Sequence, residues 1–68
     1  MKKVYDITVV FMDNTEIKYT NCPRSLMMWN NCLQVCIKSL DIWDNEFESR
    51  LHPLFNIKTF FADERDID

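Results

Sequence analysis

Glycine is absent from this chain of 68 residues, although average usage would supply about five. Its absence excludes glycine-rich phosphate loops, dinucleotide-binding fingerprints and the glycine-flanked turn that carries a catalytic serine in hydrolases. Asparagine is the non-glycine residue that best tolerates a positive φ, so it can take the place of glycine in turns. We therefore expect the turns to lie at the asparagines: Asn14, Asn21, Asn30, Asn31, Asn45 and Asn56.

The chain also lacks a long apolar run, a signal peptide and an even number of cysteines. No stretch approaches the roughly 18 apolar residues that indicate a membrane span, so we expect no membrane contact. Three cysteines, an odd number, argue against a full disulfide framework. These features together predict a protein of the reducing cytoplasm.

Chemistry-bearing residues are few. Cys22, Cys32, Cys36 and His52 could by count form a zinc site, but no Cys-x-x-Cys knuckle is present, and cysteine is often buried as a small hydrophobe. A nucleophilic Cys–His pair is conceivable, yet the only histidine directly precedes Pro53 and no glycine-built oxyanion loop exists. We expect no metal, no cofactor and no catalytic residue, and hence no enzyme.

The acidic residues are concentrated in two places. The last six residues carry four acids and one arginine, a net charge of −3, which equals the net charge of the whole chain. A second run contains Asp41, Asp44, Glu46 and Glu48. Such carboxylates could imitate nucleic acid, but the neutral body favours a solvated face and a disordered tail. The eight basic residues are scattered, so direct nucleic-acid binding is not expected.

Residues 5–19 predict a β-hairpin, because apolar side chains alternate with polar ones on both sides of a turn. A two-residue loop would place Glu16 and Lys18 opposite apolar residues. A three-residue loop at residues 12–14 instead pairs Phe11 with Thr15, Val9 with Ile17 and Ile7 with Tyr19. A slip of one residue would exchange the two faces, so the apolar pattern selects this second register, with Asn14 as the left-handed residue.

The middle of the chain fits two templates. As strands, it turns at Asn30-Asn31 and pairs Met28 with Leu33 and Leu26 with Val35; Leu26 and Met28 then face the core, and Met27 and Trp29 point outward. As a helix, it spans residues 25–40, where apolar residues recur at spacings of three and four. We favour strands, since an Asn-Asn pair suits a helix interior poorly and the region of residues 35–37 is β-branched.

Residues 40–51 are similarly ambiguous. A turn at Asp44-Asn45 would set Ile42 beside Phe47, whereas the apolar spacing also fits a helix. Pro53 ends whatever precedes it, because the residue before proline is pushed out of the α region. We expect a tight helical turn at residues 53–57, a last strand at residues 58–63 and a frayed acidic end.

The fold class that follows is mainly β. It is a small antiparallel β-meander of five or six short strands built from hairpins, with at most one short helix in the middle; the alternative is an α+β fold with a helix around residues 25–40. A single domain would span residues 1–62, followed by an acidic tail at residues 63–68. A chain this short forms only a marginal core, which favours self-association as a dimer.

Two segments, FMDNTEIKY near the N-terminus and PLFNIKTFFADE near the C-terminus, resemble short uncharacterised proteins encoded by tailed phages and prophages. Those proteins often open with a strand, an Asp-Gly-Thr turn and a second strand, and close with a Pro-Leu-x-Asn-Ile-Lys-x-Phe segment. The resemblance covers about a third of the chain, and Asn14 stands where the pattern has glycine. It implies a small β-rich phage accessory protein and carries over no site residue.

The expected function is non-enzymatic protein binding, by a phage-encoded accessory protein in the host cytoplasm. It would modulate or inhibit a host enzyme such as a defence nuclease, in the manner of an anti-CRISPR protein. The alternatives are an oligomer that sequesters a small ligand and a structural subunit of a phage assembly. Exposed Met and Trp are enriched at interfaces. The candidate partner-binding residues, which combine such side chains with the acidic run, are Met27, Trp29, Asp41, Trp43, Asp44, Glu46 and Glu48.

Overall fold

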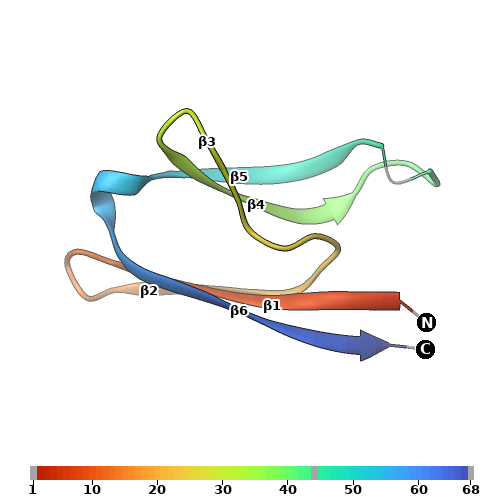
Figure 1. The fold of residues 1–68 in the computed structure, drawn as a ribbon, viewed down its shortest axis with the longest axis horizontal. Coiled ribbons are helices and arrows are strands. Elements are labelled where there is room, and N and C mark those ends of the chain that lie inside the picture. Colours follow the sequence, from red (N-terminus) through yellow and green to blue (C-terminus); the bar gives the residue numbers. More distant parts are fainter. Residues whose placement is uncertain (1, 44, 68) are drawn as a thin grey trace.

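A computed structural model describes residues 2–43 and 45–67, whose strands form two antiparallel three-stranded sheets (Figure 1). The first sheet has the order β2-β1-β6, with β1 at Lys2–Phe11, β2 at Glu16–Cys22 and β6 at Ile57–Ile67. The second has the order β3-β4-β5, with β3 at Met27–Trp29, β4 at Cys32–Ser39 and β5 at Phe47–Pro53. The mainly β fold class is confirmed, and the alternative helix around residues 25–40 is wrong.

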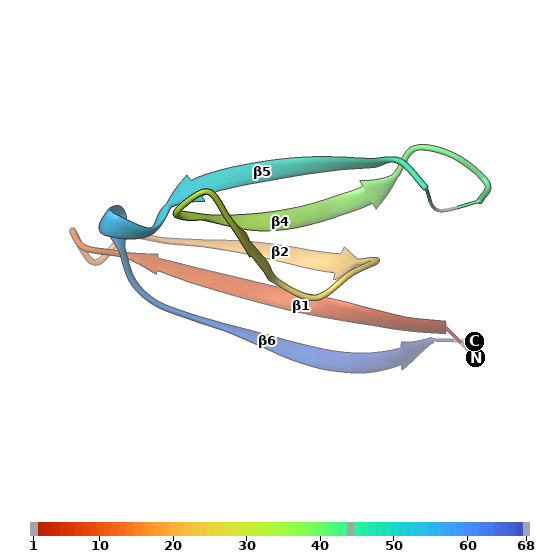
Figure 2. The same cartoon turned by 45° about the horizontal axis from the view of Figure 1, so that its top comes forward.

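The two sheets face one another and enclose the core, as the rotated view in Figure 2 makes clear. Each sheet contributes its central strand, with Ile7 and Val9 from β1 and Leu33 and Val35 from β4 fully buried. Cys22 at the end of β2 and Ile57 at the start of β6 complete this cluster. The core is therefore made of small and branched side chains, and most of the aromatic residues lie around it.

The N-terminal hairpin has the predicted register. Ile7 pairs with Tyr19 and Val9 with Ile17, and the amide of Phe11 donates to the carbonyl of Thr15 at 2.8 Å. Asn14 closes the loop with a φ of 71°. Asp13 stabilises the turn, because its carboxylate accepts from both the amide and the hydroxyl of Thr15. These hydrogen bonds, from the hydroxyl first, hold the pKa of Asp13 below its usual range.

The second hairpin also turns where the sequence indicates. Asn30 and Asn31 have φ values of 50° and 59°, which suits a two-residue turn with two left-handed residues, and Met28 pairs with Leu33 as predicted. β3 begins only at Met27, however, so the expected pairing of Leu26 with Val35 does not form part of it. The prediction that Met28 faces the core is wrong: its side chain is 56% exposed, because β3 is an edge strand that packs mainly on β4.

The connection between β4 and β5 is longer than expected. Ser39 pairs with Phe47, so the described residues between them, 40–43 and 45–46, form a loop. The predicted pairing of Ile42 with Phe47 is therefore wrong, as is a helix over residues 40–51. Asp44 lies outside the described residues. Pro53 ends β5, and a single 3₁₀ turn, η1 at Leu54–Asn56, returns the chain to the first sheet, which confirms the tight helical turn.

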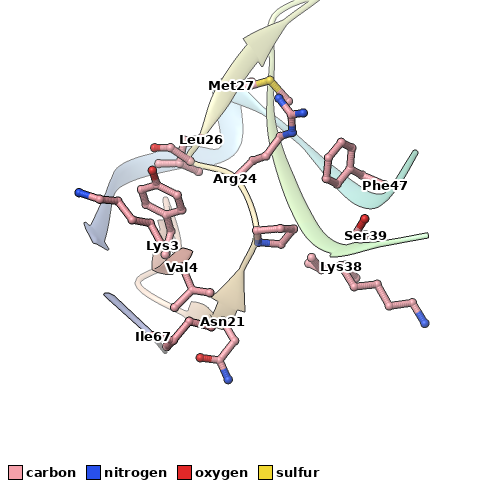
Figure 3. A pocket seen from close by; sticks show the side chains of 14 residues that line it. Lys3, Val4, Asn21, Arg24, Leu26, Met27, Lys38, Ser39, Phe47 and Ile67 are labelled. Atoms are coloured by element: carbon pink, nitrogen blue, oxygen red, sulfur yellow. The ribbon is translucent and has the colours of Figure 1, made fainter. Parts of the chain in front are cut away.

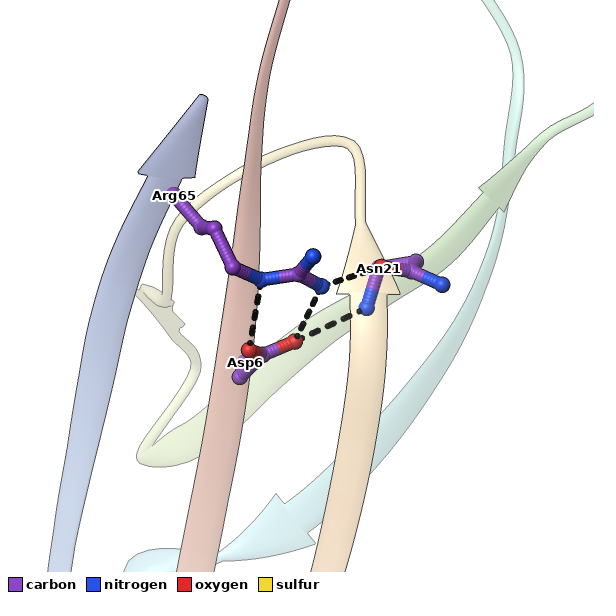
Figure 4. A network of polar contacts seen from close by, with 3 residues as sticks. All are labelled: Asp6, Asn21 and Arg65. Carbon is purple, nitrogen blue, oxygen red and sulfur yellow. Dashed lines mark hydrogen bonds and ion pairs between the residues drawn. The ribbon is translucent and has the colours of Figure 1, made fainter. Parts of the chain in front are cut away.

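The acidic C-terminal segment is part of the fold. β6 pairs with β1 along its length to Ile67, so residues 63–67 do not fray and no boundary falls at residue 62. Arg65 donates to both carboxylate oxygens of Asp6, at 3.1 and 3.2 Å, and to the side-chain oxygen of Asn21 (Figure 4). The amide of Asn21 also donates to Asp6 at 3.1 Å. One network therefore ties together the three strands of the first sheet.

Candidate functional site

The β4–β5 loop, which we define by its described residues 40–43 and 45–46, presents three exposed large apolar side chains, and one of them, Ile42, is the most exposed among the residues that the structure describes. Ile42 is 86% exposed and Trp43 is 75% exposed, and Leu40 is also more than half exposed. The loop projects beyond the end of the second sheet, on the same side as the chain termini (Figure 1). Neither Ile42 nor Trp43 belongs to the core, so their presence is not explained by the packing of the domain.

Hydrogen bonds within the loop hold it in a defined shape. The amide of Leu40 donates to the carbonyl of Glu46 at 2.7 Å and closes the base of the loop. The amide of Asn45 donates to the carboxylate of Asp41 at 2.8 Å, and the hydroxyl of Ser39 donates to the carbonyl of Asp41 at 3.0 Å. Asp41 thus organises the loop from both its side chain and its backbone, and the apolar tip is presented by a closed loop.

Acidic residues lie in the loop and beside it in the chain. Asp41 and Glu46 lie in the loop itself, and Glu48 lies near the start of β5. The carboxylate of Glu48 lies 3.7 Å from the ammonium of Lys38 and 3.8 Å from the guanidinium of Arg50, in exposed ion pairs. The loop therefore combines an apolar tip with carboxylates, a combination that suits an apolar recess with a basic rim on a partner.

The structure separates the predicted partner-binding residues into two groups. Asp41, Trp43, Glu46 and Glu48 lie in or beside the β4–β5 loop, and Asp44 lies outside the described residues. Trp29 pairs with Cys32 at the opposite end of β4, and Met27 lies between these ends, opposite Gln34. Trp29 is nevertheless well exposed, at 60%, so β3 is a second surface rather than an extension of the first.

Sequence reasoning missed Ile42 and Leu40 as members of the loop surface. The apolar spacing of residues 40–51 predicts either a helix or a hairpin, and both predictions put these two residues in regular secondary structure. The available signal was the sequence DIWDNE, in which two large apolar residues lie between acids and beside an asparagine. A pair flanked in this way is poorly suited to a buried strand, and it is consistent with an exposed loop.

The cysteines and the histidine do not form a nucleophilic site. Burial raises the pKa of the Cys22 and Cys36 thiols, which keeps them protonated. Cys32 and His52 are near neighbours on β4 and β5, but His52 is opposite Leu33, so it and Cys32 project from different faces of the sheet. Among residues 2–43 and 45–67, no group of three His, Cys, Asp or Glu residues is placed to hold a metal ion.

His52 instead contacts Tyr19, with its Nε2 atom 2.8 Å from the tyrosine hydroxyl. The ring of Phe11 packs edge-on against the imidazole, at 5.4 Å between centroids. Burial in this apolar setting lowers the pKa of His52 and raises that of Tyr19, so both groups are neutral near pH 7. The histidine is therefore a packing residue between the two sheets.

No protein-family model, curated protein or solved structure matches the chain. Within the part of the chain that the structure describes, no helix is long and apolar enough to cross a membrane.

Proposed function

We propose that this chain is a non-catalytic protein-binding module that docks through its β4–β5 loop. The observation that carries the proposal is the adjacent pair Ile42 and Trp43, exposed at the tip of a loop that its own hydrogen bonds close. Large aromatic and aliphatic anchors of this kind supply most of the binding energy at protein interfaces, since they bury much area with little loss of rotamer freedom.

The partner surface that fits this loop is an apolar recess with lysine or arginine at its rim. Ile42 and Trp43 would fill the recess, and Asp41 and Glu46 would face the basic rim. Charges at a rim contribute mainly to the rate of association, whereas the buried anchors set the rate of dissociation. Salt should therefore slow association with a modest effect on dissociation.

The resemblance of the two terminal segments to short phage proteins supports a narrower form of the proposal. In this form the chain is a phage-encoded accessory protein of the host cytoplasm, and its partner is a host enzyme, such as a defence nuclease, whose activity the loop modulates or blocks. A loop that inserts into a basic-rimmed recess would compete with a substrate that uses the same recess.

The test is capture from a bacterial host lysate followed by measurement of the captured enzyme. The purified chain is immobilised through a tag attached at Phe55, which is exposed in η1, so the loop stays free to bind. Wild-type chain and the double variant Ile42→Ser, Trp43→Ala are compared in the same lysate. A partner held by the wild type and lost by the variant is then purified, and its activity is measured with and without the chain.

Trp29→Ala is the matched control, because it removes an equally large exposed indole from the opposite end of β4. The proposal requires that Trp29→Ala retain the partner and that the loop variant lose it, with both variants keeping the wild-type melting temperature. Equal capture by all three chains would contradict docking through the loop. Capture without any change in the partner's activity would leave protein binding in place and overturn the inhibitory role.

A further inference from the structure

An open cavity of about 680 Å³ lies between the two sheets, at the end where β1 begins and β4 ends. Its walls come from the start of β1, the segment of residues 23–26 between β2 and β3, the end of β4 and the start of β5. Cavities of roughly 300 to 1,000 Å³ are typical of sites for small organic molecules. None of the fully buried side chains among the described residues lines this space.

One wall of the cavity is flat and aromatic. The guanidinium of Arg24 lies 4.4 Å from the centre of the Phe47 ring, over its face. Figure 3 shows these two side chains beside one another, with the thioether of Met27 next to the guanidinium. Stacking of this kind holds the planar guanidinium of Arg24 in place. A flat ligand can then lie against the guanidinium and the aromatic ring.

The charge of the lining has one sign. Lys3, Arg24 and Lys38 line the cavity, and no carboxylate does so among the described residues. Figure 3 places Lys3 and Lys38 on opposite sides of it, with their ammonium ends directed outward. Each lysine forms an exposed ion pair outside the lining, Lys3 with Glu64 and Lys38 with Glu48. Pairs this exposed are weak and screened by salt, so they compete poorly with an anion bound in the cavity.

Polar groups that can orient a ligand are also present. Asn21 and Ser25 lie on the β2 side of the cavity, and Tyr5 contributes an aromatic ring with a hydroxyl. The lining thus combines apolar area, a few hydrogen-bonding groups and net positive charge, which is the composition of sites that bind amphipathic organic anions.

We propose that this cavity binds a small organic anion that contains a planar ring. The ring lies against the Arg24 and Phe47 wall, and the anionic group faces the guanidinium of Arg24. This binding site is distinct from the tip of the β4–β5 loop, since Ile42 and Trp43 do not line the cavity, although Ser39 and Phe47, which flank the loop, do. The chain would therefore carry two sites, one for a protein and one for a small molecule.

The experiment is a titration of isotope-labelled chain followed by NMR, with naphthalene-2-sulfonate as the probe. Naphthalene-2-sulfonamide is the matched neutral compound, with the same ring and nearly the same shape. We expect the sulfonate to shift the amide signals of residues around the cavity, such as Ser25, Ser39 and Phe47, in a saturable way. The sulfonamide should bind at least about tenfold more weakly than the sulfonate, since one charge-assisted contact is missing.

Arg24→Gln tests the residue that forms the wall, and Lys58→Gln is its control. Lys58 is also an exposed cation, but its ammonium bonds to Asn14 in the β1–β2 turn, at the other end of the molecule. Arg24→Gln should weaken sulfonate binding by about tenfold, and Lys58→Gln should leave it unchanged. Melting temperatures of both variants are compared with the wild type, and Lys38→Gln replaces Arg24→Gln if the latter is unfolded.

Three results would overturn the proposal. They are the absence of saturable shifts, equal affinity for sulfonate and sulfonamide, and shifts confined to residues outside the cavity. Because the loop variant Ile42→Ser, Trp43→Ala leaves the cavity intact, it should bind the sulfonate normally. Failure of the cavity proposal is thereby distinguished from failure of the docking proposal.

Discussion

Nε2 of His52 and the hydroxyl of Tyr19 share a hydrogen bond of 2.8 Å, and this bond joins the second sheet to the first. Tyr19 belongs to β2 and His52 to β5, and the contact is half buried beside the ring of Phe11. Polar groups placed between two packed layers contribute orientation as well as stability, because an unpaired hydroxyl or imidazole would be costly there. The pair therefore helps to fix how one sheet lies on the other.

This contact predicts a loss of stability in mild acid. Burial lowers the pKa of His52 in the folded chain, so the unfolded chain takes up a proton first as the pH falls below about 6.5. The free energy of unfolding should therefore decrease as the pH falls below that value, and level off below the folded-state pKa. Urea melts between about pH 7.5 and 5.5 measure it. His52→Gln, which retains a hydrogen-bonding group, should remove the slope in that window; an equal slope would assign it elsewhere.

The left-handed conformation of Asn14 predicts an asymmetry between two substitutions. Asn14→Gly should change the free energy of unfolding by less than about 0.5 kcal/mol, because glycine has no steric penalty at a positive φ. Asn14→Val should lose more than about 1 kcal/mol, since a β-branched residue resists that conformation. The loss of the Lys58 contact is common to both variants, so it does not affect the comparison. Equal urea midpoints for the two would contradict the turn geometry.

Removal of residues 65–68 should destabilise the protein. The sequence alone indicates a frayed tail whose deletion has little effect, but Arg65 bonds to Asp6 and Asn21, and β6 pairs with β1 as far as Ile67. We expect the melting temperature to fall by about 5 °C or more. Arg65→Ala should give part of this loss. Thr59→Ala is the control, since Thr59 is exposed on the same strand, opposite Val10 and outside the Asp6, Asn21 and Arg65 network. An unchanged melting temperature in the deletion variant would refute the pairing.

The same network predicts which part of the acid denaturation depends on Asp6. Hydrogen bonds from Arg65 first and from the Asn21 amide second hold the pKa of Asp6 below its usual range. The stabilisation is present above the unfolded-state pKa of about 4 and is lost as the pH falls through the lower folded-state value. Asp6→Asn should be less stable at pH 7 and should lose less stability between about pH 5 and 2 than the wild type. Parallel pH profiles for the two chains would show that Asp6 is not so perturbed.

Self-association through β3 is the remaining prediction. β3 is an edge strand of three residues, Met27, Met28 and Trp29, all exposed, and such an edge is a site for pairing with a second copy. We expect a dimer by light scattering at micromolar concentration, and Trp29→Ala should shift it toward monomer. Trp43→Ala serves as the control. A clean monomer of 8.2 kDa would refute the prediction, and a dimer unaffected by Trp29→Ala would place the interface elsewhere.

Local chemistry explains what could be predicted from the sequence. Both hairpin turns depend on asparagines that take a positive φ, and the register of β1 with β2 depends on apolar alternation over a few residues. These signals lie within about 15 residues of one another, so they can be interpreted without knowledge of the fold.

Long-range strand pairing explains which features could not be predicted from the sequence. The acidic segment resembled a tail because its partners, Asp6 and Lys3, are about 60 residues away in the chain. The exposure of Met28 depends on which strands cover β3, and the loop position of Ile42 depends on where β4 and β5 pair. Of the predicted binding residues that the structure describes, Asp41, Trp43, Glu46 and Glu48 lie together in or beside the loop, whereas Met27 and Trp29 are separated from them.

The position of β6 beside β1 has a consequence for how the protein is made. β1 emerges first from the ribosome, but one of its two neighbours in the sheet is the last strand to be synthesised. Until residues 57–67 are outside the exit tunnel, the edge of β1 that pairs with β6 is unpaired. The β1–β6 pairs that must then form join residues that are among the most distant in the chain. The first sheet therefore completes only after translation of its last strand, whereas the three strands of the second sheet are consecutive and pair over shorter distances along the chain.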